Sequence, residues 1–396
     1  MSFRLHPLLW QAAALALGAA VSLGLSRFAY ALLLPPMRAD LGWSYLTAGA
    51  MNTVNAAGYL AGALLVPRLL RRASPRALLL VGSAATAALL AGHGLVRTDA
   101  PLFALRGLSG LASALSFVCG GLLAARLGSA PADELPQSAR PSAALVLGLY
   151  YGGTGVGIIV ATALVTPLVE YARAPGWPWA WLALAAAALL ATLLMAAGTR
   201  RLAPVAHAAA GGAGVRLRSL GFALAGYLMF GLGYIGYMTF NVTLLREQGV
   251  GSGGIAAFYA LLGAGVVASS WLWADLLQRH RGGVPMALLN GLLALATLLP
   301  VLSASVPTAF ASGLLFGSVF LSVVASTTAL VRHNLDATAW PAGIAAFTIV
   351  FAVGQIVGPT LVGWVADGPG GLRAGFAGSA AALTLGAWLA WRQKPL

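Results

Sequence analysis

Long apolar segments recur along this chain from one end to the other, and few charges interrupt them. Of the 396 residues, 60% are hydrophobic and only 8% are charged, whereas a soluble globular protein carries roughly 25% charged residues. Each segment is long enough to cross about 30 Å of hydrocarbon as a helix. A helix satisfies its backbone hydrogen bonds internally, as a chain in lipid requires. The sequence therefore predicts an all-α membrane protein that crosses a bilayer many times.

Breaks at charges, prolines and glycine clusters divide the sequence into twelve predicted transmembrane helices. Residues 199–217 form a polar gap, with arginines around an Ala- and Gly-rich middle, and this composition is typical of a linker. We therefore expect an N-terminal six-helix half at 1–198, a cytoplasmic linker at 199–217 and a C-terminal six-helix half at 218–396. The predicted helices cover residues 8–35, 45–67, 76–96, 101–127, 142–168, 177–198, 218–244, 253–277, 284–304, 307–331, 341–366 and 372–391.

The basic residues are distributed unevenly over the predicted loops. Lysine and arginine collect in the cytoplasmic loops of membrane proteins. If both termini are cytoplasmic, most of the 23 basic residues lie inside, and the outside receives only Arg38, Arg97, Arg173, Arg246 and Arg373. This bias predicts a multi-pass protein of a bacterial inner membrane with both termini in the cytoplasm. The first apolar run continues to residue 34, so we expect it to be a retained helix and not a cleaved signal peptide.

Several other classes of function receive no support from the sequence. The net charge of +14 is spread over short loops, so it does not indicate nucleic-acid binding. The single Cys119 lies in an apolar segment, which leaves no disulfide framework and no cysteine-based metal site. There is no phosphate-binding loop for ATP-driven transport. An intramembrane enzyme would need clustered acids, His or Cys at membrane depth, and the sequence has no such cluster. We expect no cofactor and a monomeric protein.

Predicted helices one and seven share a short pattern. Gly24, Leu25 and Tyr30 recur at the same spacing as Gly231, Leu232 and Tyr237, about half the chain later. Two parallel repeats of six helices are the arrangement of the major facilitator fold.

Local motifs strengthen this resemblance to the major facilitator superfamily. Arg106–Ala114 resembles the family's R-x-x-x-G motif, whose arginine in relatives faces the central cavity and is linked to proton or substrate handling. Trp273–Gly282 resembles the cytoplasmic D-x-x-x-R-x-[RK] gating loop. The equivalent loop after helix two keeps its arginines but has Val66 where an acid is expected. The gating residues implied by the resemblance are Asp275, Arg279, Arg281, Arg71 and Arg72.

Glycine-rich stretches at 152–157 and 354–359 are similar to the family's G-x-x-x-G-P segments, where small residues allow close helix approach. Within the superfamily, Ser26–Pro35 and Asn55–Leu64 resemble the YbfB/YjiJ-type transporters. The superfamily resemblance covers the whole chain, and the subfamily resemblance carries no defined substrate.

The charged residues inside the predicted helices indicate which charge the substrate carries. Arg27 lies inside the first predicted helix, where a cation is costly and usually faces a cavity or a partner. It could anchor an anion or act as an outer-gate residue, and Arg106 could contact substrate or form a structural pair. All nine acidic residues fall in loops or at helix ends. A transporter of cationic drugs normally needs an acid at the midplane, so the sequence favours an anionic or neutral polar substrate.

Polar and aromatic residues on the predicted helices could line a central cavity. Tyr227, Tyr234 and Tyr237 share one helix face, because their spacing matches the helical period. In lipid such groups turn inward to find partners. The complete set of candidate substrate-binding residues is Arg27, Tyr30, Asn52, Asn55, Tyr59, Arg106, Tyr150, Tyr151, Tyr227, Tyr234, Tyr237, Asn241 and Gln355.

The sequence thus predicts a secondary active or facilitative transporter that moves a small solute by alternating access. The expected partners are a small-molecule substrate and the lipid bilayer, and a coupling proton is left open. Two alternatives remain at this point: a multidrug or metabolite efflux pump coupled to protons, and a membrane receptor of the same fold that binds a solute without moving it.

Overall fold

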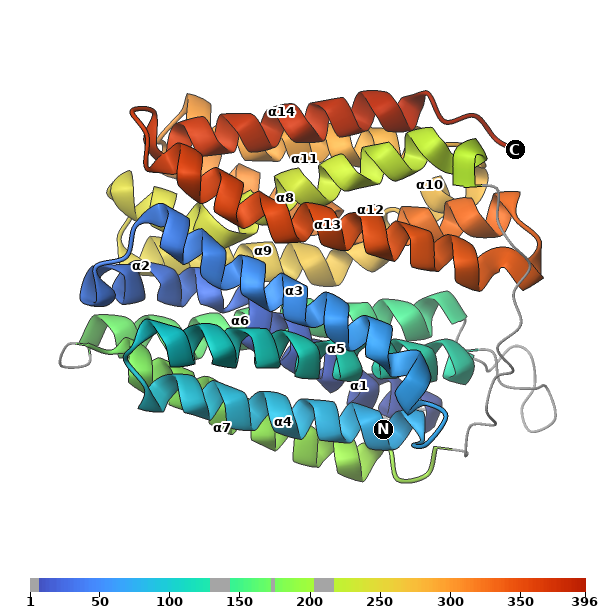
Figure 1. The fold of residues 1–396 in the computed structure, drawn as a ribbon, viewed down its shortest axis with the longest axis horizontal. Helices are drawn as coiled ribbons and strands as arrows, with labels where there is room; N and C mark the ends of the chain where they lie inside the picture. Colours follow the sequence, from blue (N-terminus) through green and yellow to red (C-terminus); the bar gives the residue numbers. More distant parts are fainter. Residues whose placement is uncertain (1–6, 129–142, 172–174, 203–216) are drawn as a thin grey trace, which may run out of the picture. The chain divides into compact units, whose positions relative to one another are not determined.

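The structure, a computed structural model, describes residues 7–128, 143–171, 175–202 and 217–396, and all regular elements in these ranges are helical. Figure 1 shows the long helices α1 to α14. Their bounds are α1 Pro7–Ala19, η1 Ala20–Phe28, α2 Tyr30–Leu41, α3 Tyr45–Leu69, α4 Pro75–Leu95, α5 Asp99–Gly128, α6 Ala143–Tyr171, α7 Trp177–Gly198, η4 Leu217–Leu220, α8 Gly221–Glu247, α9 Ser252–Leu272, α10 Ala274–Arg279, α11 Val284–Leu302, α12 Val306–Asn334, η5 Ala337–Ala339, α13 Trp340–Ala366 and α14 Gly371–Trp391.

Within the described residues, eleven helices are long and apolar enough to cross a membrane. The first of these spans joins α1, η1 and α2 into one continuous run from Leu8 to Leu41. Helix α3 has 25 residues, enough to cross, but Asn52, Thr53 and Asn55 make it more polar than the others. The expectation of an all-α membrane protein with about twelve spanning helices is confirmed.

Ordinary capping chemistry sets several helix ends. Helices α4 and α12 begin after Ser74 and Ser305, whose hydroxyl groups accept the backbone N–H of the residue three positions later. A proline within the first turn follows each serine, where its missing N–H costs nothing. Gly42, just after α2, has φ = +67°, a left-handed conformation that favours glycine.

The chain divides into two compact units. Unit 1 comprises residues 1–29 and 58–207, and unit 2 comprises residues 30–57 and 208–396. The expected division at 1–198, 199–217 and 218–396 remains a prediction, and residues 203–216 of the expected linker lie outside the described residues.

In unit 1, α4 packs against α5 and α7, and α1 with η1 packs against α6. Glycines allow the closest approaches. A Cβ on Gly58 of α3 would lie only 1.9 Å from the carbonyl oxygen of Gly107 in α5. A Cβ on Gly24 of η1 would lie 2.5 Å from the Cα of Gly157 in α6. These contacts join backbone to backbone, as small residues permit between helices in lipid.

In unit 2, α8 lies beside both α13 and α14, and α12 packs against α9 and α11 (Figure 1). Residues 30–57 belong to this unit because they contact its helices directly. Thr53 donates a hydrogen bond to the carbonyl of Ile356, at 2.6 Å. The carboxylate of Asp367 accepts the N–H groups of Tyr45 and Leu46, each at 2.9 Å, at the first turn of α3. A carboxylate at this position complements the positive end of the helix dipole.

Candidate functional site: buried arginines and aromatic clusters

Arg27 lies in the last turn of η1, a π-helical stretch in the middle of the first span. All nine residues of η1 are buried, and the Arg27 side chain is only 4% exposed. Its guanidinium carbon lies 5.6 Å from the ring centroid of Tyr59 in α3. Irregular π-helical turns inside α-helices are frequent at functional sites, so the backbone also singles out this position.

Arg106 holds the backbone next to Arg27. It is fully buried in α5 and donates a hydrogen bond of 3.0 Å to the carbonyl of Ser26. Ser113, also in α5, donates to the Ser26 hydroxyl at 3.3 Å. The ring of Trp181 lies 6.0 Å from the Arg106 guanidinium carbon and is stacked on His93 at 4.6 Å. The contacts of Arg106 therefore position the stretch that carries Arg27.

A cluster of four aromatic residues in unit 1 lies beside Arg27: Tyr59, Phe117, Tyr150 and Tyr151. The ring of Phe117 lies 6.5, 5.7 and 5.9 Å from those of Tyr59, Tyr150 and Tyr151, respectively. The hydroxyl of Tyr150 donates to the Phe117 carbonyl at 2.6 Å, which ties α6 to α5. Phe117 was absent from the predicted set, because an isolated phenylalanine in an apolar helix gives no sequence signal.

The predicted residues of unit 2 make many contacts with one another or with the backbone. Tyr227 and Tyr234 are buried in a stack of rings with Phe230 and Phe351. Asn52 donates to the hydroxyl of Thr239 at 2.7 Å.

Three further candidates of unit 2 are also buried. The hydroxyl of Tyr30 donates to the Ala48 carbonyl at 2.9 Å, a bond within the segment 30–57. Asn55 is 1% exposed and Gln355 is 4% exposed. A substrate role for any of these residues remains a prediction.

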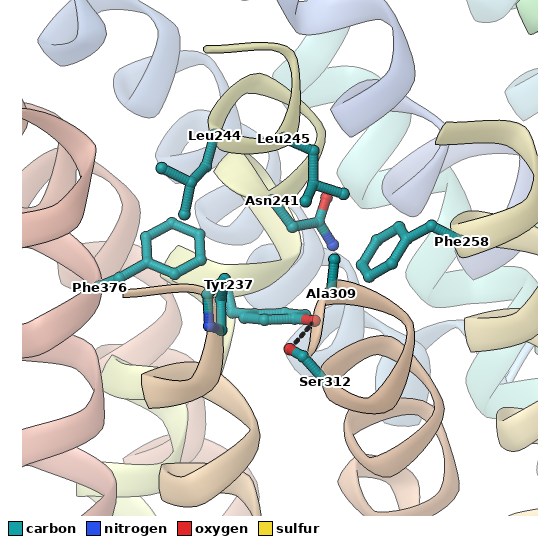
Figure 2. Close-up of a pocket in the computed structure, with 9 residues that line it drawn as sticks. Tyr237, Asn241, Leu244, Leu245, Phe258, Ala309, Ser312 and Phe376 are labelled. Carbon is teal, nitrogen blue, oxygen red and sulfur yellow. Dashed lines mark hydrogen bonds between the residues drawn. The ribbon is translucent and has the colours of Figure 1, made fainter. Parts of the chain in front are cut away.

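Tyr237 and Asn241 line a small pocket in unit 2, shown in Figure 2. The Tyr237 hydroxyl bonds to Ser312 at 2.7 Å, and Ser312 donates to the Ala296 carbonyl at 2.7 Å. The space that a water-sized sphere reaches is about 10 Å³, close to the minimum for one water molecule. As it stands, the pocket is too small for a metabolite.

The predicted gating residues lie in the short helix α10 or in turns between helices. Asp275 and Arg279 in α10 form an ion pair at 2.7 Å, and their side chains are 70% and 73% exposed. The backbone carbonyl of Arg281 accepts a hydrogen bond from Asn334 at 2.6 Å, which ties this turn to the end of α12. Arg71 and Arg72 are exposed in the turn between α3 and α4.

Sequence reasoning also missed a polar cluster in unit 2, where α2, α3 and α8 meet. The Tyr45 hydroxyl bonds to the carboxylate of Glu247, and the Arg38 guanidinium carbon lies 3.8 Å from the Tyr45 ring centroid. Tyr45 and Glu247 are 202 positions apart, and one sequence without an alignment has no signal that pairs such distant residues.

In the part of the chain that the structure describes, the regular elements are helices, eleven of them apolar enough to cross a membrane, and these features define a multi-pass membrane protein. More particularly, the chain belongs to the major facilitator superfamily: residues 19–391 match the family described as "Uncharacterised MFS-type transporter YbfB". The protein is therefore a membrane transporter and not an enzyme. None of the curated proteins matches this sequence.

Solved structures of transporters share the fold at low sequence identity. A bacterial homologue of the human lysosomal transporter Spinster has a TM-score of 0.73 and 14% identity, over 97% of this chain and 96% of that one. The nucleoside transporter NupG has a TM-score of 0.69 and 13% identity, over 98% and 100%. The human organic anion transporter MFSD10 has a TM-score of 0.62 and 16% identity, over 98% and 100%. At these identities the similarity shows the fold alone.

Proposed function

We propose that this protein is a secondary active or facilitative transporter of a small anionic or neutral polar solute, working by alternating access in a bacterial inner membrane. Both termini face the cytoplasm in this proposal. Alternating access requires parts of the chain that can move as separate bodies, and the division into two compact units, each with its own internal packing, supports this.

The proposed substrate class is supported by the distribution of charged residues along the membrane spans. Arg27 and Arg106 are buried within membrane spans, Arg27 near the middle of its span and Arg106 in the second turn of α5. The described acidic residues lie instead at helix ends or in turns, and they are Asp40, Asp99, Glu170, Glu247, Asp275, Asp336 and Asp367. The potential at membrane depth is therefore positive within the described helices. It attracts an anion and repels a cation, most strongly where water is excluded.

Purified protein tests this proposal in two stages. A thermal-shift panel of carboxylates, neutral polyols and lipophilic cations first identifies stabilising solutes, because a ligand that binds the native state raises the unfolding temperature. Flux of each hit is then measured in liposomes, with and without a proton gradient. We expect at least one anion or neutral polar solute to stabilise the protein and to cross the membrane.

The other outcomes decide between the alternatives. Transport of lipophilic cations alone, driven by a proton gradient, would establish the efflux pump and refute the proposed substrate class. A solute that binds tightly but never crosses would establish the receptor. Flux that is unaffected by a proton gradient would favour facilitative transport over proton coupling.

A further inference from the structure

One aromatic cluster in unit 2 and one in unit 1 arrange their rings in different ways. In unit 2, the rings of Tyr227, Phe230, Tyr234 and Phe351 stack almost parallel, with interplanar angles of 8° to 22° and centroids 4.7 to 5.5 Å apart. Tyr227, Phe230 and Tyr234 are also buried, at 0% to 3% exposure. Each ring lies nearly parallel to its neighbour, so little ring face in this stack remains open.

The aromatic rings of unit 1 are inclined to one another. Phe117 makes angles of 56° with Tyr59 and 52° with Tyr151, at centroid distances of 6.5 and 5.9 Å. Tyr59, Phe117 and Tyr151 are also partly exposed, unlike the buried Tyr227, Phe230 and Tyr234. Rings at these angles do not cover one another's faces, and a further ring can add to them by offset stacking or edge-to-face contact.

The positively charged Arg27 lies beside Tyr59, at one end of this aromatic cluster. The Arg27 guanidinium lies over the Tyr59 ring at 5.6 Å, which places a planar cation one ring away from Phe117. A guanidinium can bind a carboxylate through two parallel hydrogen bonds, which an ammonium group cannot match. The bond from Arg106 to the Ser26 carbonyl fixes the backbone immediately before Arg27.

Backbone contacts hold these rings in place before any ligand arrives. The approach of Gly58 to Gly107 fixes α3 on α5 one residue from Tyr59. The Tyr150 hydroxyl fixes α6 on the Phe117 carbonyl, one residue from Tyr151. Rigid supporting contacts reduce the entropy that binding would otherwise cost.

We propose that the solute is a planar organic anion with an aromatic ring, of which an aromatic carboxylate is the simplest example. Its ring packs on Phe117, Tyr59 and Tyr151, and its anionic group binds Arg27. This assignment rests on the proposed transport of an anionic or polar solute and narrows it to one chemical class.

Matched probes test the ring separately from the charge. Benzoate and cyclohexanecarboxylate carry the same anionic group on six-membered rings, but only benzoate is planar and aromatic. Aromatic contacts stabilise a complex beyond the burial of apolar area, so wild-type protein should bind benzoate roughly five-fold more tightly than cyclohexanecarboxylate, or better. Equilibrium dialysis of the detergent-solubilised full chain with labelled probes measures both dissociation constants.

Variants then locate the ring site. Phe117→Leu and Tyr151→Leu should each move the ratio of the two dissociation constants toward one, and should change cyclohexanecarboxylate binding far less than benzoate binding. Both dissociation constants are measured on the same protein sample, so partial unfolding weakens the apparent binding of both probes equally and leaves their ratio unchanged. Phe222→Leu is the matched control, since Phe222 is 45% exposed on α8 in the other unit, and its ratio should equal that of wild type.

The failures of the two proposals are distinguishable. A wild-type ratio near one, or no binding of either probe, would overturn the aromatic class. Anion transport by the protein would still stand if another carboxylate were carried. An unchanged ratio in both Phe117→Leu and Tyr151→Leu would place the ring elsewhere and refute the assignment. Transport of benzylammonium without any benzoate binding would overturn both proposals.

Discussion

At the scale of single residues, the two buried arginines have different surroundings although the sequence presents them alike. Arg27 lies over the ring of Tyr59, whereas Arg106 donates to the Ser26 carbonyl beside Trp181. Sequence reasoning identified both positions, because a cation inside an apolar span is conspicuous. It could not assign their partners, since a backbone carbonyl on another helix leaves no trace in side-chain identity.

Replacement of Arg27 by glutamine should weaken binding of the best carboxylate ligand about ten-fold or more. The variant loses a charge-assisted hydrogen bond, which is worth about 1.5–3 kcal/mol. Arg27→Lys should recover only part of the affinity, because lysine lacks the planar fork. Titration calorimetry of the three proteins gives the comparison. Equal affinity in wild type and Arg27→Gln would show that Arg27 is structural and does not touch the solute.

Replacement of Arg106 should affect stability first. Arg106→Gln removes the charged donor to the buried Ser26 carbonyl, and a hydrogen bond from a charged group contributes about 1.5–3 kcal/mol. The unfolding temperature in detergent should fall. Arg373→Gln, at an exposed position of α14, is the control and should unfold like wild type. If both variants unfold at the same temperature, the buried hydrogen bond does not stabilise the fold.

At the scale of elements, ten of the twelve expected helices agree with the structure to within about three residues, because apolar length and capping residues are local properties. Helix α3, for example, was expected at 45–67 and covers Tyr45–Leu69. The first span ends at Leu41 and not at residue 35, and α9 ends at Leu272 and not at residue 277. The sequence did not reveal the π-helical geometry of Ala20–Phe28, since tertiary packing and not residue propensity decides such a distortion. The sequence also did not reveal the aromatic cluster of Tyr59, Phe117, Tyr150 and Tyr151, because its rings meet only when α3, α5 and α6 pack together.

Two glycine-to-alanine changes inside helices should have opposite effects. Gly58→Ala places a methyl group 1.9 Å from the Gly107 carbonyl oxygen, so α3 and α5 must separate and the unfolding temperature should fall. Gly291→Ala in α11 meets nothing within 4 Å and should be neutral or stabilising by up to about 1 kcal/mol. Thermal unfolding of both variants provides the measurement. A Gly58→Ala protein as stable as Gly291→Ala would mean that the close approach carries no packing energy.

A substitution in the exposed helix α10 should change the rate of transport more than it changes the unfolding temperature. Exposed ion pairs such as Asp275 with Arg279 contribute about 0–1 kcal/mol to folding. Asp275→Asn should therefore leave the unfolding temperature nearly unchanged and slow liposome flux, if the turn is part of a gate. Asp336→Asn, another exposed acid, controls for the lost charge. Wild-type flux in Asp275→Asn would remove this residue from the mechanism.

At the scale of the whole molecule, the family and the number of helices followed from hydropathy and motifs, whereas the grouping of residues into compact units did not. Residues 30–57 belong to the first half by sequence, yet they pack with α8 and α13 in unit 2. Asp367 and Tyr45 are 322 positions apart, and only the folded chain can bring such residues together.

The orientation of the chain can be tested with single cysteines in a Cys119→Ala background. Ser2→Cys and Ala209→Cys should resist an impermeant thiol reagent added to spheroplasts, because the bias of basic loops places both in the cytoplasm. Ala304→Cys, exposed before α12, should react as the external control. Reaction at position 2 or 209 in intact spheroplasts would reverse the proposed topology.

The π-helical stretch η1 has a consequence for insertions and deletions. The N–H of Ala29 bonds to the carbonyl of Gly24, five residues back. Deleting one residue from Ala20–Phe28 would allow this stretch to become α-helical with its backbone hydrogen bonds intact. The wider turn of a π-helix takes up one extra residue, so this deletion would leave the face that α2 presents to α8 nearly unchanged. A deletion scan should therefore find variants between Ala20 and Ser26 that insert, remain helical by circular dichroism and keep flux.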